Sequence, residues 1–149
     1  HEVELGIVIG KECKNVSQAE ALDTILGYCL ALDMTACLDF DKFSMLLIKG
    51  FDTACPLSEF IPKEKISDPD NVDLELKVNG HLRQKSNTKE MINNCARIIS
   101  YLSKYFKLEY GDLILTGTPP GQSFVCKNDL IEAKLGELKN LKFKVVEEE

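Results

Sequence analysis

The sequence contains no tryptophan, only two histidines and no Cys-x-x-Cys pair, and these absences exclude several kinds of site. Zinc ribbons and thioredoxin-type redox motifs need closely spaced cysteine pairs or a cluster of cysteine and histidine, so neither is expected. Most cysteines have apolar neighbours, which predicts small buried hydrophobic residues in a reducing compartment, with Cys55 and Cys95 in the core. The six cysteines are Cys13, Cys29, Cys37, Cys55, Cys95 and Cys126.

Dense runs of lysine and arginine are also missing. The 18 basic residues are outnumbered by 24 acidic ones, which gives a net charge of −6 and argues against nucleic acid as a partner. The longest apolar run, residues 25–34, is interrupted by Gly27 and Asp33 and is shorter than the ~20 residues of a membrane-spanning helix. No membrane partner is therefore expected.

What remains is typical of one globular domain, with 44% hydrophobic and 28% charged residues in a chain of 149. A chain of this length buries roughly 70% of the surface that its unfolded form exposes, so it needs no disulfide to fold. We expect a single domain over residues 1–149 and an intracellular location, in the cytoplasm or the mitochondrion. Because the sequence begins with His1 and not with Met, any targeting segment is expected upstream.

The pattern of apolar residues predicts many strands and two or three helices, with no regular alternation of strand and helix. This indicates an α+β, mainly β fold. Strands are expected at 1–10, 28–35, 48–54, 74–78, 82–85, 113–116, 130–134 and 141–146, and helices at 17–26, 39–46 and 87–105. Asn79-Gly80 between two alternating segments predicts a type I′ hairpin, which places His81 beside an exposed turn.

Three carboxylates are candidates for a metal site. Glu2 and Glu4 are two apart on the first expected strand, so both project from the same face. Asp33 ends an otherwise apolar strand, where it either points to solvent or is held by a positive charge. Such a set suits a hard ion, Mg²⁺ first and Mn²⁺ or Ca²⁺ next. The alternative is that Glu2 and Glu4 form the polar face of an edge strand.

Several ordered motifs resemble the fumarylacetoacetate hydrolase family, in particular its acylpyruvase and oxaloacetate-decarboxylase branch. They are HEVELGIVIGK, ALDMTA, KGFDTACP and GDLILTGTPPG, with IPKEKI, LKVNG-LRQ and IISYLSK also in the family's order. The resemblance implies the mixed β-roll of that family's C-terminal domain, in a homodimer. It also implies that Glu2, Glu4 and Asp33 bind a divalent metal.

The same resemblance assigns roles to three further residues. Lys49 corresponds to the family's catalytic and substrate-binding lysine, and Gly117 and Thr118 to its substrate-binding Gly-Thr-Pro loop. The implied activity is a metal-dependent hydrolase or lyase. It would cleave a carbon–carbon bond in a small 2,4-dioxo acid, or decarboxylate a 2-oxo acid such as oxaloacetate, through an enolate. Lys49 would face the developing negative charge, and Thr118 would offer its hydroxyl and nearby N–H groups to a substrate carboxylate.

Two departures from the family pattern lead to an alternative. The family's enzymes carry a general-base histidine and an acidic partner on a lid upstream of the E-x-E motif, with which this sequence begins, and residues 37–42 lack the expected Arg and Gln. We therefore expect these 149 residues to bind metal and a pyruvate- or oxalate-like anion with slow or no hydrolysis. The chain is then either part of a longer enzyme, the favoured explanation, or a non-catalytic binding or dimeric module.

Overall fold

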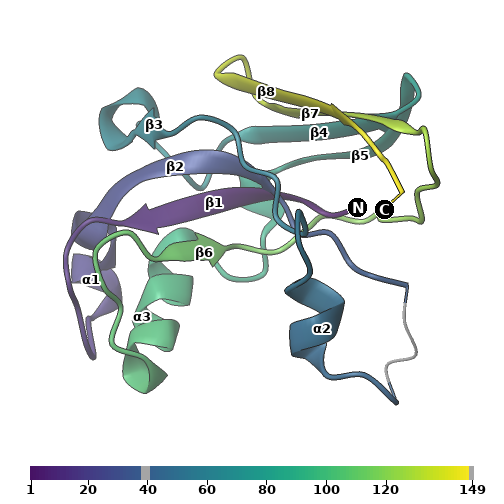
Figure 1. The fold of residues 1–149 in the computed structure, drawn as a ribbon. Coiled ribbons are helices and arrows are strands. Elements are labelled where there is room, and N and C mark those ends of the chain that lie inside the picture. The colour runs from purple at the N-terminus through teal and green to yellow at the C-terminus, as the bar shows by residue number, and fades with distance from the viewer. Residues whose placement is uncertain (38–40, 148–149) are drawn as a thin grey trace.

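The computed structural model describes residues 1–37 and 41–147, and over these residues the chain forms two antiparallel four-stranded sheets (Figure 1). The first sheet has the order β3-β2-β1-β6 and the second β5-β4-β7-β8. This confirms the α+β, mainly β prediction. The strands are β1 (Val3–Ile9), β2 (Ile25–Leu32), β3 (Ile61–Pro62), β4 (Asp73–Val78), β5 (His81–Asn87), β6 (Leu113–Leu115), β7 (Leu130–Leu135) and β8 (Lys139–Lys144).

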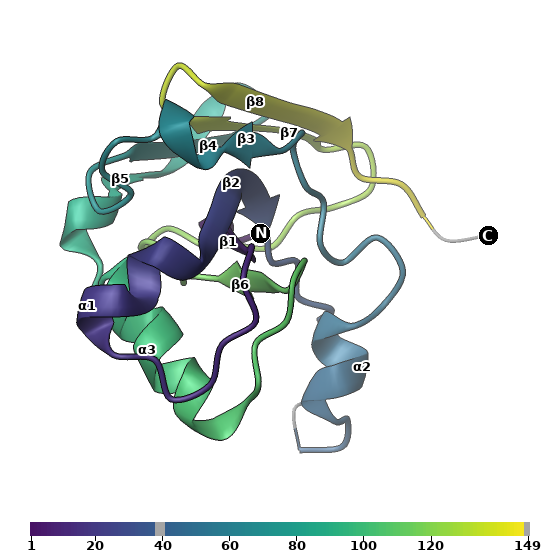
Figure 2. The same cartoon turned by 90° about the vertical axis from the view of Figure 1, so that its left-hand side faces the viewer.

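The helices lie at the periphery of the first sheet. In both ribbon views α1 (Gln18–Ala21) and α3 (Cys95–Tyr105) lie together, whereas α2 (Met45–Lys49) stands apart from them (Figure 2). Three short 3-10 turns complete the described elements: η1 (Leu22–Thr24), η2 (Lys63–Lys65) and η3 (Thr88–Glu90). None of the described helices is long and apolar enough to cross a membrane.

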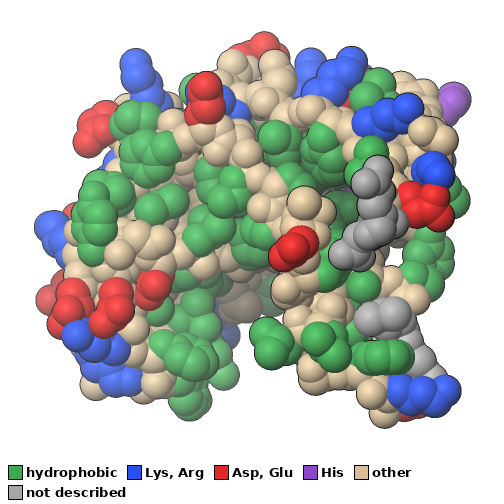
Figure 3. Space-filling view, viewed as in Figure 1, with side chains coloured by type: hydrophobic (Ala, Val, Ile, Leu, Met, Phe, Trp, Pro, Cys, Tyr) green, Lys and Arg blue, Asp and Glu red, His purple; other side chains and the backbone are tan. Residues whose placement is uncertain are grey.

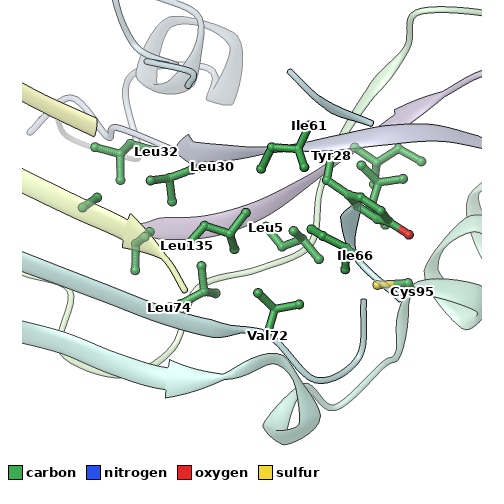
Figure 4. Packing of buried hydrophobic residues seen from close by; sticks show 14 of the residues in the cluster. Leu5, Tyr28, Leu30, Leu32, Ile61, Ile66, Val72, Leu74, Cys95 and Leu135 are labelled. Carbon is green, nitrogen blue, oxygen red and sulfur yellow. The ribbon is translucent and has the colours of Figure 1, made fainter. Parts of the chain in front are cut away.

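Strand β1 lies in the interior of its sheet, paired with β2 on one side and β6 on the other. The edge-strand alternative for Glu2 and Glu4 is therefore wrong. Its side chains alternate as the sequence pattern indicates: Val3, Leu5 and Ile7 join the core between the two sheets, and Glu4 faces the opposite way. Figure 4 shows Leu5 among side chains of both sheets. The strand that carries Glu4, and that Glu2 directly precedes, is thus held by both neighbouring strands and by the core.

The predicted hairpin is confirmed. Asn79 and Gly80 both have positive φ angles, 52° and 77°, as the two central residues of a type I′ turn require. β4 and β5 pair across this turn, and His81 is exposed beside it.

Three expectations about local structure are wrong. Residues 48–54 do not form a strand, because the apolar run that begins at Met45 is helical up to Lys49, and an apolar run this short does not distinguish helix from strand. The helix expected at 39–46 begins only at Met45, and residues 38–40 lie outside the described part of the chain. Asn87 caps only η3, and the long helix begins after Asn94, whose side chain accepts a hydrogen bond from the Arg97 N–H.

The prediction that most cysteines are buried is also wrong. Cys29 and Cys95 are buried and Cys13 is half-buried, whereas Cys37, Cys55 and Cys126 are exposed. Cys55 lies in the loop between α2 and β3, two residues after Thr53, which has a positive φ of 66°. Loop backbone runs over the protein surface, so apolar sequence neighbours do not bury this thiol.

Candidate metal and substrate site

The carboxylates of Glu2, Glu4 and Asp33 meet at the start of β1. One oxygen from each lies within 4.8 Å of the other two. The β1–β2 register brings them together: Glu4 lies opposite Ala31, and the Asp33 N–H donates to the Glu2 carbonyl at 2.9 Å just beyond the paired strands. The structure therefore assembles the three residues that the sequence nominates as metal ligands.

Lys49 supplies the positive charge beside this cluster. It is the last residue of α2, and its Nζ donates to Glu2 Oε2 at 2.8 Å, Asp33 Oδ2 at 2.9 Å and Thr35 Oγ1 at 2.7 Å. Burial by itself would lower the pKa of Lys49, but the hydrogen bonds to Glu2 and Asp33 outweigh it and the pKa is raised. Lys49 therefore remains an ammonium, and it explains how Asp33 is held at the end of an apolar strand.

Glu4 is the most deeply buried member of the cluster, with 3% of its surface exposed. Burial raises its pKa from 4.5 to about 7; the hydrogen bond from the Gly117 N–H opposes this rise, and the charges of Asp33 and Glu2 add to it. The Gly117 N–H lies 2.6 Å from Glu4 Oε2. Glu4 can therefore change its protonation state near neutral pH.

The Thr116-Gly117-Thr118 segment fastens the loop after β6 to β1. The hydroxyl of Thr116 donates to the Leu5 carbonyl at 2.9 Å, and that of Thr118 to the Val3 carbonyl at 3.0 Å. Between them Gly117 has a φ of +100°, a conformation that glycine adopts without steric cost. The two threonine side chains thus continue the β1–β6 pairing while the Gly117 N–H turns to Glu4.

Each carboxylate of the cluster has one oxygen held by a protein donor. Lys49 holds Glu2 Oε2 and Asp33 Oδ2, and the Gly117 N–H holds Glu4 Oε2. Within residues 1–37 and 41–147 no protein donor holds the second oxygen of any of the three, so these oxygens can face an ion. When Glu4 is ionised, the three carboxylates outnumber the Lys49 ammonium. Hard divalent cations prefer such oxygen ligands, and hydrogen bonds to ligating carboxylates fix their orientation. The donor set therefore fits Mg²⁺, Mn²⁺ or Ca²⁺.

The loop after β6 also borders an open cavity of about 1060 Å³. Gly117, Thr118 and Pro119 line it together with residues of η3 and α3, such as Glu90 and Tyr101. The residues that line it do not include the three carboxylates or Lys49. The structure thus places Gly117 and Thr118 next to the carboxylates on one side and the cavity on the other.

Sequence reasoning missed two polar residues of this region. Thr35, in the ALDMTA motif, accepts a hydrogen bond from Lys49. Gln84, in the LRQ segment, is buried and bonds to Thr118. Both stand in motifs that carry the family resemblance, so closer attention to polar residues in these motifs would have found them. Residues 37–42 lack the Arg and Gln of the family pattern, and residues 38–40 of this segment lie outside the described part of the chain.

Comparisons with known proteins agree with this geometry. Residues 1–146 match the family model described as fumarylacetoacetate (FAA) hydrolase C-terminal. The mitochondrial oxaloacetate tautomerase FAHD1 of Bos taurus is 50% identical over 150 residues, which cover 97% of this chain and 68% of the relative. The mitochondrial oxaloacetate decarboxylase of Dictyostelium discoideum is 48% identical over 126 residues, which cover 81% of this chain and 58% of that protein.

Solved structures give the same relationship. Fumarylpyruvate hydrolase from Pseudomonas aeruginosa, in complex with Mn²⁺ and pyruvate, superposes with a TM-score of 0.93 at 32% identity, over 99% of this chain and 65% of that one. Maleylpyruvate hydrolase from Sphingobium sp. SYK-6, in complex with manganese(II) and pyruvate, gives 0.90 at 34% identity, over 98% and 53%. The chain thus spans roughly half to two thirds of the length of these relatives.

Proposed function

Because this chain belongs to the fumarylacetoacetate hydrolase family, we propose that it is the metal-binding catalytic domain of a divalent-metal-dependent enzyme acting on small 2-oxo or 2,4-dioxo acids. The reaction is cleavage of a carbon–carbon bond in an acylpyruvate, or decarboxylation or tautomerisation of oxaloacetate. The observation that carries this proposal is the cluster of the Glu2, Glu4 and Asp33 carboxylates beside the ammonium of Lys49. A mitochondrial location agrees with the relatives' names.

Glu2, Glu4 and Asp33 hold the ion in this proposal, and Mg²⁺ and Mn²⁺ are its candidates. An ion held there would supply Lewis-acid stabilisation of the negative charge that develops on a 2-oxo acid. Lys49 lies beside the same cluster, with its Nζ 2.8 Å from Glu2 Oε2, and its ammonium would stabilise negative charge that develops on a substrate bound there, because a charge in a partly buried site is weakly screened.

Gly117 and Thr118 orient the substrate carboxylate. The Thr118 hydroxyl donates its proton to the Val3 carbonyl and the Gly117 N–H donates to Glu4. Pro119 has no N–H. The backbone N–H of Thr118 is therefore the donor that this segment can offer to a carboxylate. The hydroxyl itself fixes the loop. This divides the site into an ion-binding part on β1 and β2 and an anion-orienting part on the loop after β6.

The metal assignment predicts a thermal shift. Mn²⁺ or Mg²⁺ at a hundredfold excess over its dissociation constant should stabilise the native protein by about 2.7 kcal/mol. For a domain of this size the unfolding temperature should rise by roughly 5–10 °C, and oxalate, a mimic of the enolate, should add to the rise. In Asp33→Ala the rise should vanish, whereas Asp23→Ala, which removes an exposed carboxylate far from the cluster, should keep it.

If neither ion raises the unfolding temperature of the parent protein, the metal assignment is overturned and a non-catalytic binding module is favoured. A rise that persists in Asp33→Ala would contradict the ligand set. Turnover of oxaloacetate and of an acylpyruvate, followed by absorbance on the same samples, then assigns the reaction.

We also propose that the protein forms a homodimer. Hydrophobic side chains are exposed on α2 and just before it, including Phe43, Leu46 and Leu47, and Figure 3 shows such side chains at the foot of this part of the molecule. A second exposed set, including Ile92 and Tyr101, borders the cavity beside α3. Apolar surface of this kind marks protein–protein contacts.

The dimer predicts a particle of twice the 16.7 kDa chain mass in analytical ultracentrifugation. Leu46→Asp or Ile92→Asp should shift the mass toward the monomer, and the variant that does so identifies the interface, because burying a carboxylate in an apolar contact is unfavourable. Glu64→Lys, a charge change at an exposed position in η2, serves as the control. A monomer for the parent chain at high concentration would refute the proposal.

A further inference from the structure

Gln84 forms a bridge between the two sheets at the candidate site. It belongs to β5 of the second sheet, yet its side chain bonds to β1 of the first sheet and to the loop after β6. Its Oε1 accepts from the Val3 N–H at 3.2 Å and from His1 Nδ1 at 3.0 Å, and its Nε2 donates to Thr118 Oγ1 and the Pro119 carbonyl, both at 2.8 Å. Only 1% of the residue is exposed.

The partners of Gln84 fix the direction of every hydrogen bond in this network. The Val3 N–H can only donate and the Pro119 carbonyl can only accept, so the amide has one permitted orientation. Thr118 Oγ1 therefore accepts from Gln84 and must give its own proton to the Val3 carbonyl, which lies 3.0 Å away. All four hydrogen bonds of the buried amide are made, so the side chain holds β1 and the loop after β6 rigidly together.

The backbone next to Gln84 shows independently that the loop rests closely on β5. Gly121 has a φ of +106°, and a Cβ at this position would lie 2.1 Å from the Arg83 carbonyl oxygen. Only glycine allows this approach. The loop from Gly117 to Gly121 is therefore bounded by β1 at one end and by β5 at the other, and Gln84 joins the two.

We propose that Gln84 is a positioning residue, which sets the place of the Gly117–Pro119 loop relative to the carboxylates of β1. This role rests on the function proposed above, in which the loop orients the substrate carboxylate and Glu2, Glu4 and Asp33 bind the ion. Lys49 holds Glu2 and Asp33, two of the three proposed ligands, independently of this loop. Loss of the amide should therefore loosen the loop and weaken anion binding more than ion binding.

The test compares Gln84→Met, which keeps the length of the side chain and removes its four hydrogen bonds, with Ser103→Ala. Ser103 is also fully buried and bonded to backbone, through Val16 and Ser100, but it lies on α3. The first measurement is amide hydrogen exchange by NMR in the metal-free protein, which requires no activity. Exchange of the Gly117 N–H should accelerate about tenfold in Gln84→Met relative to Ser103→Ala.

The second measurement is titration calorimetry with Mn²⁺ and then with oxalate on the Mn²⁺-loaded protein. Substitution of a residue that orients the groups around a bound metal typically reduces metal affinity or activity by about 10–100-fold. Gln84→Met should weaken oxalate binding at least tenfold and change Mn²⁺ binding less than threefold, while Ser103→Ala should leave both unchanged. If Gln84→Met does not fold, Gln84→Glu, which keeps the acceptor oxygen and removes the amide donors, replaces it.

Equal Gly117 exchange and equal oxalate affinity in the two variants would overturn the role of Gln84. A parent protein that binds neither Mn²⁺ nor oxalate would instead overturn the proposed function, and the exchange measurement would still decide whether Gln84 positions the loop.

Discussion

Replacing Glu4 with glutamine should make the metal-free protein more stable than the parent chain at pH 8. Burial raises the pKa of Glu4 from 4.5 to about 7, so the folded protein at pH 8 holds an ionised carboxylate in a place that disfavours its charge. Each pKa unit corresponds to about 1.4 kcal/mol, which sets the gain at roughly 3 kcal/mol. The glutamine amide oxygen can still accept the Gly117 N–H.

The stability gained by Glu4→Gln should increase as the pH rises. A carboxyl group with a raised pKa contributes stability that is fully present below pH 4.5, where both states are protonated, and lost as the pH rises to about 7. The difference in unfolding free energy between Glu4→Gln and the parent should therefore grow between pH 4.5 and pH 7 and be small below that range. Urea unfolding at a series of pH values measures it, with metal removed by a chelator.

Glu75 provides a control of opposite sign. Its carboxylate pairs with Lys77 at 3.0 Å and its pKa is lowered, chiefly by that hydrogen bond, so Glu75→Gln should be slightly destabilising at pH 8. Added Mn²⁺ should reverse the first result, because only the parent keeps the full ligand set. A Glu4→Gln variant that is less stable than the parent in metal-free buffer at pH 8 would contradict the account of Glu4.

Leu5→Ala should remove about 2–5 kcal/mol of stability. Leu5 is fully buried on β1 between the two sheets, and truncation leaves a cavity that the surrounding strands cannot fill (Figure 4). At about 2–4 °C per kcal/mol, the unfolding temperature should fall by roughly 5–20 °C. Leu26→Ala, on the adjoining strand but partly exposed, should have a much smaller effect.

Urea unfolding distinguishes a loss of stability from a loss of structure for Leu5→Ala. The midpoint should fall while the dependence on urea concentration stays unchanged, since the amount of surface exposed on unfolding is almost the same. Equal losses for Leu5→Ala and Leu26→Ala would show that the core does not lie where the structure places it.

The sequence predicts best those features that depend on neighbouring residues. The alternation of Val3, Glu4 and Leu5 predicts which side chains of β1 face the core, and Asn79-Gly80 predicts the hairpin, because backbone geometry alone decides both. Local pattern nominates Glu2, Glu4 and Asp33 one by one, whereas their assembly into one site depends on the pairing of β1 with β2 and is implied only by the family resemblance.

Features that depend on distant contacts are not predictable in the same way. The helix at Met45–Lys49 is a short apolar run compatible with a strand, and only Ile48 of it is buried. The exposure of Cys55 depends on the path of a loop, and the burial of Gln84 depends on contacts with Val3 and Thr118, which lie 81 and 34 residues away in the sequence. The residues next to Cys55 and Gln84 in the sequence do not indicate that the first is exposed and the second buried, although Gln84 belongs to one of the family motifs.

The carboxylates and the ammonium of the candidate site belong to parts of the molecule that differ in how well they tolerate substitutions. Glu4 lies on β1 and Glu2 directly precedes it, where substitutions of neighbouring residues disturb the core, whereas Lys49 ends a five-residue helix that contributes a single buried side chain. Variation in α2 can therefore alter the reach and angle of the ammonium without unfolding the protein. Within such an architecture, reaction preference can diversify through the helix while the ion-binding strand stays constant.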